Sequence, residues 1–121
     1  MKYFLSLPWI FVSAFCLPVH AKRLAPKPVK PVTNAGLRYE DVEWAFENGK
    51  MKQNGGYVRV VNTRNGLTIC TKQVYETKYD EKMELDVQDN FITSLKVEGG
   101  NLVISSEKLA PIRKPIANFC D

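Results

Sequence analysis

The stretch that decides the fold is YVRVVNTRNGLTIC, residues 57–70. Its first half, residues 57–61, is a run rich in β-branched side chains, which favour strands. Asn65-Gly66 follows, and this dipeptide is the strongest short-range signal for a tight hairpin turn. Residues 67–75 then form the return segment, in which Leu67, Ile69, Thr71, Gln73 and Tyr75 are expected to share one face. The stretch therefore predicts an antiparallel hairpin.

The segments around this hairpin continue the β pattern. Residues 42–46 alternate apolar and other side chains (Val42, Trp44 and Phe46), as a half-buried strand does. Residues 91–97 and 102–105 flank Gly99-Gly100 and predict a second hairpin. The tail from residue 108 contains Pro111 and Pro115, so we expect an extended edge segment there. The fold class is therefore mainly β: one small antiparallel domain over residues 36–121, sandwich-like or a meander, with five to six strands.

The stretch from Asp80 to Asn90 fits two descriptions. Met83, Leu85 and Val87 alternate as in a strand, whereas Met83, Val87 and Phe91 share one face of a helix. Because Asp80 is a suitable helix N-cap, we expect at most one short helix in residues 80–90.

The N-terminus of the 121-residue chain has the layout of a secretory signal peptide. Met1-Lys2 is followed by an apolar run from Tyr3, and residues 18–21 (PVHA) suit cleavage after Ala21. A membrane anchor is the alternative, but two prolines interrupt a run shorter than the ~20 residues of a spanning helix. A lipoprotein is a further alternative because Cys16 ends the run, although Phe15 is bulky for that processing signal. We therefore expect residues 1–21 to be removed, with a periplasmic or secreted product that has no transmembrane segment.

Removal of residues 1–21 would take away the only histidine, His20. Catalytic triads, Cys–His pairs and histidine metal ligands are then excluded. Cys70 and Cys120 would remain, and an even number of cysteines in an exported protein predicts a disulfide. A redox pair is the alternative, but the sequence contains no CxxC spacing. We expect a structural bridge that ties the C-terminus to the strand holding Cys70.

Residues 22–35 (KRLAPKPVKPVTNA) form a proline- and lysine-rich arm. Proline at this density favours an extended segment without its own core, so we expect the arm to be flexible. The arm carries +4 and residues 32–121 carry −1, so the basic character of the chain does not indicate a nucleic-acid-binding face. The arm could serve either as a spacer or as a polybasic segment that contacts a partner.

The acidic residues Asp80, Glu84, Asp86 and Asp89 form the densest group of potential ligands. Several carboxylates can bind Ca²⁺, and two can act as acid and base. However, the spacing does not match an EF-hand loop, and a solvated or salt-bridging face is the simpler interpretation. A small Ca²⁺-binding or carboxylate-based enzymatic module is thus the alternative function.

The leading hypothesis is a non-enzymatic exported interaction domain for a protein or envelope component, without a cofactor or catalytic residues. The candidate interaction surface comprises Tyr57, Arg59, Arg64 and Tyr75. Two routes suit a domain this small: strand addition at an exposed sheet edge, and a homodimer that buries Tyr57 and Tyr75.

Two stretches resemble known proteins. Residues 56–70 resemble the hairpin of one blade of a pyrroloquinoline-quinone-type β-propeller, with Cys70 where such a blade has tryptophan. A propeller needs several blades, so quinone binding is not implied. Asn54-Gly55-Gly56-Tyr57, Val74-Tyr75 and residues 86–95 (DVQDNFITSL) are together similar to a group of small exported bacterial proteins of unknown function. That likeness covers residues 36–106 and implies no catalytic residues.

Overall fold

The structure is a computed structural model that describes residues 25–44, 51–84 and 86–121. The predicted signal peptide lies outside these residues. Within the described part of the chain, seven antiparallel strands form two sheets, so the mainly β fold is confirmed. The four-stranded sheet has the order β1-β2-β3-β4, with β1 (Val32–Asn34), β2 (Leu37–Val42), β3 (Tyr57–Asn62) and β4 (Thr68–Gln73). The three-stranded sheet has the order β5-β6-β7, with β5 (Ile92–Glu98), β6 (Asn101–Ser106) and β7 (Ile112–Pro115).

The decisive stretch forms the β3–β4 hairpin, with Tyr57 paired to Gln73 and Val60 to Cys70. The connection is longer than a two-residue turn: the Asn62 N–H donates to Leu67 O at 2.9 Å, and Gly66 has a φ of 75°. Ile69 is an additional residue opposite the Val60–Val61 step, and such a bulge increases the local twist.

The end of the arm belongs to the sheet, which corrects the expected boundary at Gly36. Val32–Asn34 forms β1 and pairs with β2, while Val29 and Val32 pack against the core. Ala35 and Gly36 make the two-residue turn, with φ values of 51° and 80°. These few apolar residues suffice because strand pairing with β2 satisfies the backbone of β1. The arm therefore supplies one strand beyond the predicted five to six, and the tail supplies β7.

The second predicted hairpin is present as β5 and β6. Glu98 pairs with Asn101, and both Gly99 and Gly100 have positive φ values, as a type I′ turn requires. The proline-containing tail pairs with β6 as β7, at the edge of its sheet, as expected. The strand expected at residues 42–46 is only partly testable: β2 ends at Val42, Glu43 and Trp44 lie beyond it, and Phe46 lies outside the described residues.

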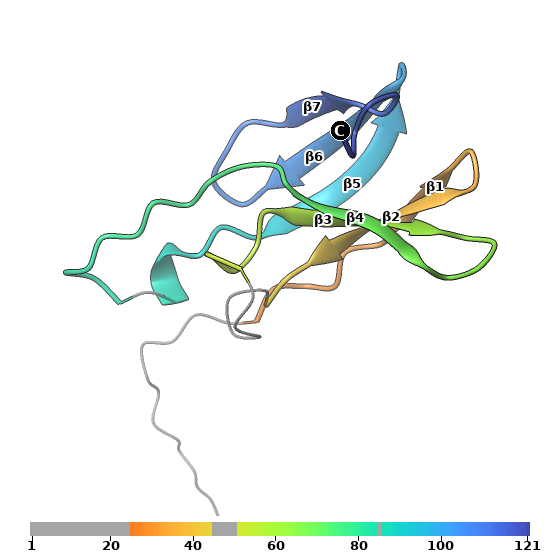
Figure 1. Cartoon of the computed structure of the whole chain (residues 1–121). Helices are drawn as coiled ribbons and strands as arrows, with labels where there is room; N and C mark the ends of the chain where they lie inside the picture. The colour runs from red at the N-terminus through yellow and green to blue at the C-terminus, as the bar shows by residue number, and fades with distance from the viewer. Residues whose placement is uncertain (1–24, 45–50, 85) are drawn as a thin grey trace, which may run out of the picture.

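The core lies between the two sheets (Figure 1). β5 packs across β1 and β2. The buried cluster draws on both sheets and on the C-terminal segment, and its members are Tyr39, Val58, Val60, Val74, Tyr75, Ile92, Leu95, Leu102, Ile104 and Phe119. Phe119 packs edge-on against Tyr39 with ring centroids 5.7 Å apart. The C-terminus is therefore part of the folded domain.

The ambiguous stretch between the sheets contains one short 3₁₀ helix, η1 (Asp86–Gln88), which fits the expectation of at most one short helix. The preceding loop folds around Gln88, whose Nε2 donates to the carbonyl oxygens of Asp80, Met83 and Glu84. A local side-chain network, rather than an amphipathic pattern, thus gives this loop its shape.

Candidate functional site

A buried polar cluster joins the segment before β3 to the segments after β4 and η1. Gln53 is at its centre: its Nε2 donates to Gly55 O at 2.9 Å and to Tyr75 O at 3.0 Å. Its Oε1 accepts from the Thr77 N–H at 2.7 Å. The sequence analysis did not single out Gln53, because one glutamine in a polar loop carries no signal of burial.

Asn54 and Asp89 extend this cluster toward η1. The Asp89 carboxylate accepts from the Tyr79 hydroxyl at 2.6 Å and from Asn54 Nδ2 at 3.3 Å. Burial, together with the hydrogen bond to Asp89, raises the pKa of Tyr79 to about 12. The buried side chains of Gln53 and Asp89 thus have hydrogen-bond partners within the cluster, which is typical of a network that fixes a fold.

Close backbone packing explains the two glycines beside this cluster. A Cβ on Gly55 would lie 2.6 Å from the carbonyl oxygen of Asn90, and the φ of Gly55 is 78°. A Cβ on Gly56 would lie 2.5 Å from Gln53 Nε2. The Tyr75 hydroxyl donates to that same Asn90 carbonyl. The segments 54–57, 74–75 and 86–95, which are far apart in the sequence, therefore meet in one place.

Tyr57 and Tyr75 are buried, with exposed fractions of 4% and 8%. Their predicted role in an exposed interaction surface or an aromatic dimer interface is therefore wrong. Tyr57 points to the outer face of its sheet, but the segment before β3 covers it, and its hydroxyl accepts from the Lys52 N–H at 3.2 Å. The alternation along the strand places the Tyr57 ring on one face of the sheet, but it cannot show that a loop covers that face.

The acidic segment does not bring its carboxylates to one point. Asp89 is buried in the polar cluster, whereas Asp80 and Glu84 are exposed, and Asp80 Oδ1 accepts from the Lys82 N–H at 2.9 Å. The Asp86 side chain lies outside what the structure describes. Within the described residues, no group of three His, Cys, Asp or Glu side chains is placed to hold a metal ion.

Asp41 is the most unusual ionisable residue and was missed by the sequence analysis. It pairs with Val58 and shares the core face of β2 with Tyr39. Both of its carboxylate oxygens are buried, and neither accepts a hydrogen bond from a described residue. Burial, with the adjacent charge of Glu43, raises its pKa to about 7. The sequence did contain a signal of this burial: Asp41 follows Tyr39 by two positions, so the two side chains share one face of a strand.

Glu40, the neighbour of Asp41, has the opposite environment on the outer face of β2. Its carboxylate lies 2.6 Å from Arg38 Nε and 3.0 Å from Arg59. Burial alone would raise its pKa, but the hydrogen bonds from the two guanidinium groups hold it below the ordinary value. Arg59 is thereby engaged within its own sheet, while Arg64 lies exposed at the hairpin turn.

The β3–β4 hairpin presents the most exposed apolar side chains near a strand edge. Leu67 is 65% exposed and Ile69 is 50% exposed. Leu67 immediately precedes β4 and Ile69 lies within it, and β4 pairs only with β3 among the described strands. Arg59 and Arg64 of the predicted surface lie on this hairpin, as do the exposed side chains of Leu67 and Ile69.

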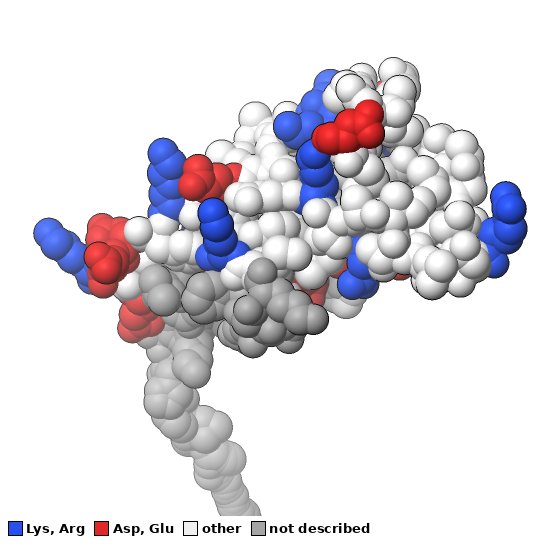
Figure 2. Space-filling view, viewed as in Figure 1, with Lys and Arg blue, Asp and Glu red and all other residues white. Residues whose placement is uncertain are grey.

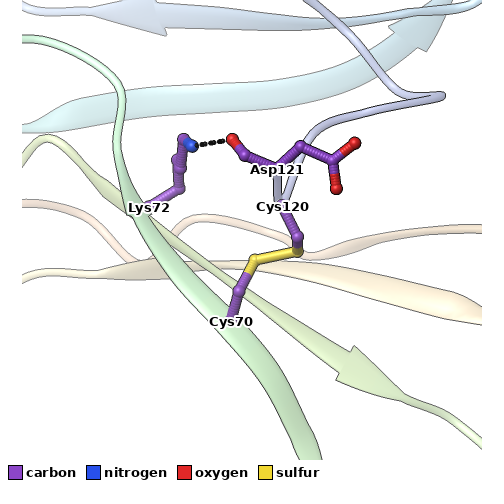
Figure 3. Close-up of a disulfide and its surroundings, with 4 residues drawn as sticks. All are labelled: Cys70, Lys72, Cys120 and Asp121. Atoms are coloured by element: carbon purple, nitrogen blue, oxygen red, sulfur yellow. Dashed lines mark hydrogen bonds between the residues drawn. A yellow bond between two sulfur atoms is a disulfide. The ribbon is translucent and has the colours of Figure 1, made fainter.

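The predicted disulfide joins Cys70 of β4 to Cys120 and is confirmed (Figure 3). The two Cα atoms are 5.9 Å apart. Beside the bridge, Lys72 Nζ donates to the backbone oxygen of Asp121 at 2.6 Å. The last residues are thus held to β4 by a covalent bond and a charged hydrogen bond.

Charges of both signs are mixed on the face shown in Figure 2, where basic and acidic side chains lie beside one another. On the outer face of the second sheet, Glu98 pairs with Arg113 at 2.7 Å and with Lys96 at 3.3 Å. Such pairing does not form the continuous basic stripe that nucleic-acid binding uses.

Two broader observations complete the description. Within residues 25–44, 51–84 and 86–121, no helix has the length and apolar character needed to cross a membrane. The chain matches no protein-family model, and comparison with curated proteins and with solved structures finds no match.

Proposed function

We propose that this protein is a non-enzymatic exported interaction domain that binds an extended segment of a partner protein by strand addition at β4. The observation that carries the proposal is that one edge of β4 pairs with no described strand, while the side chains of Leu67, just before β4, and Ile69, within it, are exposed. Strand addition obtains its affinity from main-chain hydrogen bonds and its specificity from adjacent side chains. The signal-like N-terminus and the disulfide support the exported setting.

The hydrogen-bond pattern indicates which backbone groups face the partner. The Val74 N–H donates to Gly56 O, so this is a hydrogen-bonded position of the β3–β4 ladder. Such positions alternate along an antiparallel pair. Cys70 and Lys72 therefore bond to β3, whereas the N–H and C=O groups of Thr71 and Gln73 point away from it, toward the free edge.

The other edges are less suited to strand addition. β1 has three residues and follows Pro31, and β7 has four residues between Pro111 and Ile116 and ends at Pro115. Short strands and prolines are the usual protection against edge pairing. β5 packs across β1 and β2. By contrast, β4 has six residues and no proline, and the disulfide of Cys70 holds the strand to the C-terminal segment.

A photo-crosslinking amino acid at position 71, introduced into the protein in its native host, tests this proposal. The matched control carries the same group at Thr33, an exposed position on β1 at the opposite edge of the sheet. We expect an adduct of discrete mass from position 71 that Leu67→Asp with Ile69→Asp abolishes. Leu109→Asp, which alters an exposed leucine elsewhere, should leave it unchanged.

The mass of the adduct identifies the partner class. Twice the mass of the chain would show that the partner is a second copy, and another mass would show a different protein. Equal adducts from positions 33 and 71, or an adduct that survives the Leu67 and Ile69 substitutions, would contradict the proposal.

A further inference from the structure

Asp41 places a carboxyl group where no described residue donates a hydrogen bond to it. Its oxygens are buried on the core face of β2, opposite the fully buried Val58. An ionised carboxylate without hydrogen bonds is very unfavourable in such a place, so the group takes up a proton instead. A protonated Asp41 is neutral and tolerates this environment far better.

Among the described residues, the charged and titratable groups around Asp41 do not offset the cost of its burial. Glu43, two residues along the chain, is acidic, and burial also raises its pKa. Tyr75 faces Asp41 from the segment after β4, and its pKa is raised by burial and then by the charges of Asp41 and Glu107. Lys72 occupies the same cross-strand row on β4, but its ammonium group donates to Asp121.

Two contacts between described residues hold the chain immediately after Asp41. The carbonyl of Glu43 accepts from the Gly55 N–H at 2.8 Å. The Trp44 ring packs against Phe91 with centroids 5.0 Å apart. These contacts link the end of β2 to the buried polar cluster and to the start of β5. A charge on Asp41 would favour hydration of this end and would oppose them.

We propose that Asp41 is a proton-operated latch: the protonated carboxyl keeps the end of β2 and Trp44 packed on the core, and ionisation releases them. The direction of the pH effect on stability follows from the pKa of Asp41 in the folded and unfolded states. In the unfolded chain the carboxyl has its ordinary pKa of 3.8, whereas burial raises the pKa to about 7 in the folded domain. The resulting stability is fully present below the lower value and is lost as the pH rises through the higher one.

The two pKa values of Asp41 set an upper limit on how strongly pH changes the stability of the domain. Between pH 5 and pH 8, full coupling would raise the unfolding equilibrium constant up to about 80-fold. Because the side chain is not completely enclosed, we expect a smaller rise, of at least about fivefold. The latch therefore favours the closed domain in acidic surroundings and a loosened β2 end above neutral pH.

Urea unfolding from pH 5 to pH 8 of the full chain carrying Trp9→Phe tests the latch, because Trp44 is then the only tryptophan. We expect the unfolding midpoint to fall with pH, and Trp44 emission in native buffer to shift to longer wavelength with a midpoint near 7. Asp41→Asn in this background should remove both responses. Glu40→Gln, which alters the paired carboxylate on the opposite face, should retain both.

Carbon NMR of the Asp41 carboxyl in the otherwise unaltered protein provides a measurement that does not depend on the stability of a variant. We expect it to titrate between pH 6 and pH 8. Titration below pH 5, a pH response that persists in Asp41→Asn, or native Trp44 emission that does not change with pH would each overturn the proposal.

Discussion

The Cys70–Cys120 disulfide closes a span of 50 residues, which includes all of the second sheet. Replacing both cysteines by serine removes this constraint from the unfolded chain and leaves the noncovalent contacts of the C-terminus in place. The chain-entropy relation gives a loss of about 4 kcal/mol for a loop of this length. A domain of this size has a total stability of about 5–15 kcal/mol, so the loss is a large fraction of it.

Two contacts determine how much of the C-terminal segment stays folded without the bridge. Phe119 is buried against Tyr39, and Lys72 holds the Asp121 carbonyl. Because Phe119 occupies the core, we expect the double variant to remain folded at 25 °C rather than lose β7 and the tail. Adding Phe119→Ala should cost about 3 kcal/mol more, because it removes a buried aromatic side chain from the core.

Urea denaturation followed by far-ultraviolet circular dichroism measures the loss. Wild-type protein treated with reductant should match the double variant, and the slope m should increase in both because the reduced chain exposes more surface on unfolding. Cys16→Ser, in a chain that retains residues 1–21, is the control and should have no effect. A loss below about 1 kcal/mol would refute the reasoning, because it would mean that bridging does not restrict the unfolded chain.

Three further substitutions test the buried cluster and the first turn by the same assay. Gly55→Ala should cost about 3 kcal/mol of stability, because its Cβ would meet the Asn90 carbonyl oxygen at 2.6 Å. Gly66→Ala is the control: Gly66 has a similar φ but nothing within 4 Å of the added Cβ, so the loss should be about 1 kcal/mol. Equal losses would contradict the close-packing argument. Gln53→Ala should cost about 3 kcal/mol, because it leaves buried backbone groups without partners; a loss under 1 kcal/mol would show that water replaces the side chain. Ala35→Asn should stabilise the domain by about 0.5 kcal/mol, because asparagine tolerates the φ of 51° better than alanine does; an unchanged or lower midpoint would contradict this.

The sequence by itself determined the features that depend on neighbouring residues. The turn residues Asn65-Gly66 and Gly99-Gly100 fixed both hairpins, because only glycine adopts a positive φ there without cost. The Pro115-containing tail was readable as an edge strand for a similar local reason. The disulfide followed from counting cysteines once residues 1–21 were set aside.

Only the tertiary structure decided which faces are covered. It placed the end of the arm in β1, buried Tyr57 and Tyr75, and left Leu67 and Ile69 exposed. It also put the Asp41 carboxyl against the core, without a hydrogen bond from any described residue. Alternation assigns a side chain to one of two faces of a strand, but burial depends on which distant segment packs over that face. The physical reason is that covering interactions, such as those of Gln53 and Phe119 here, are long-range and leave no periodic trace in the local sequence.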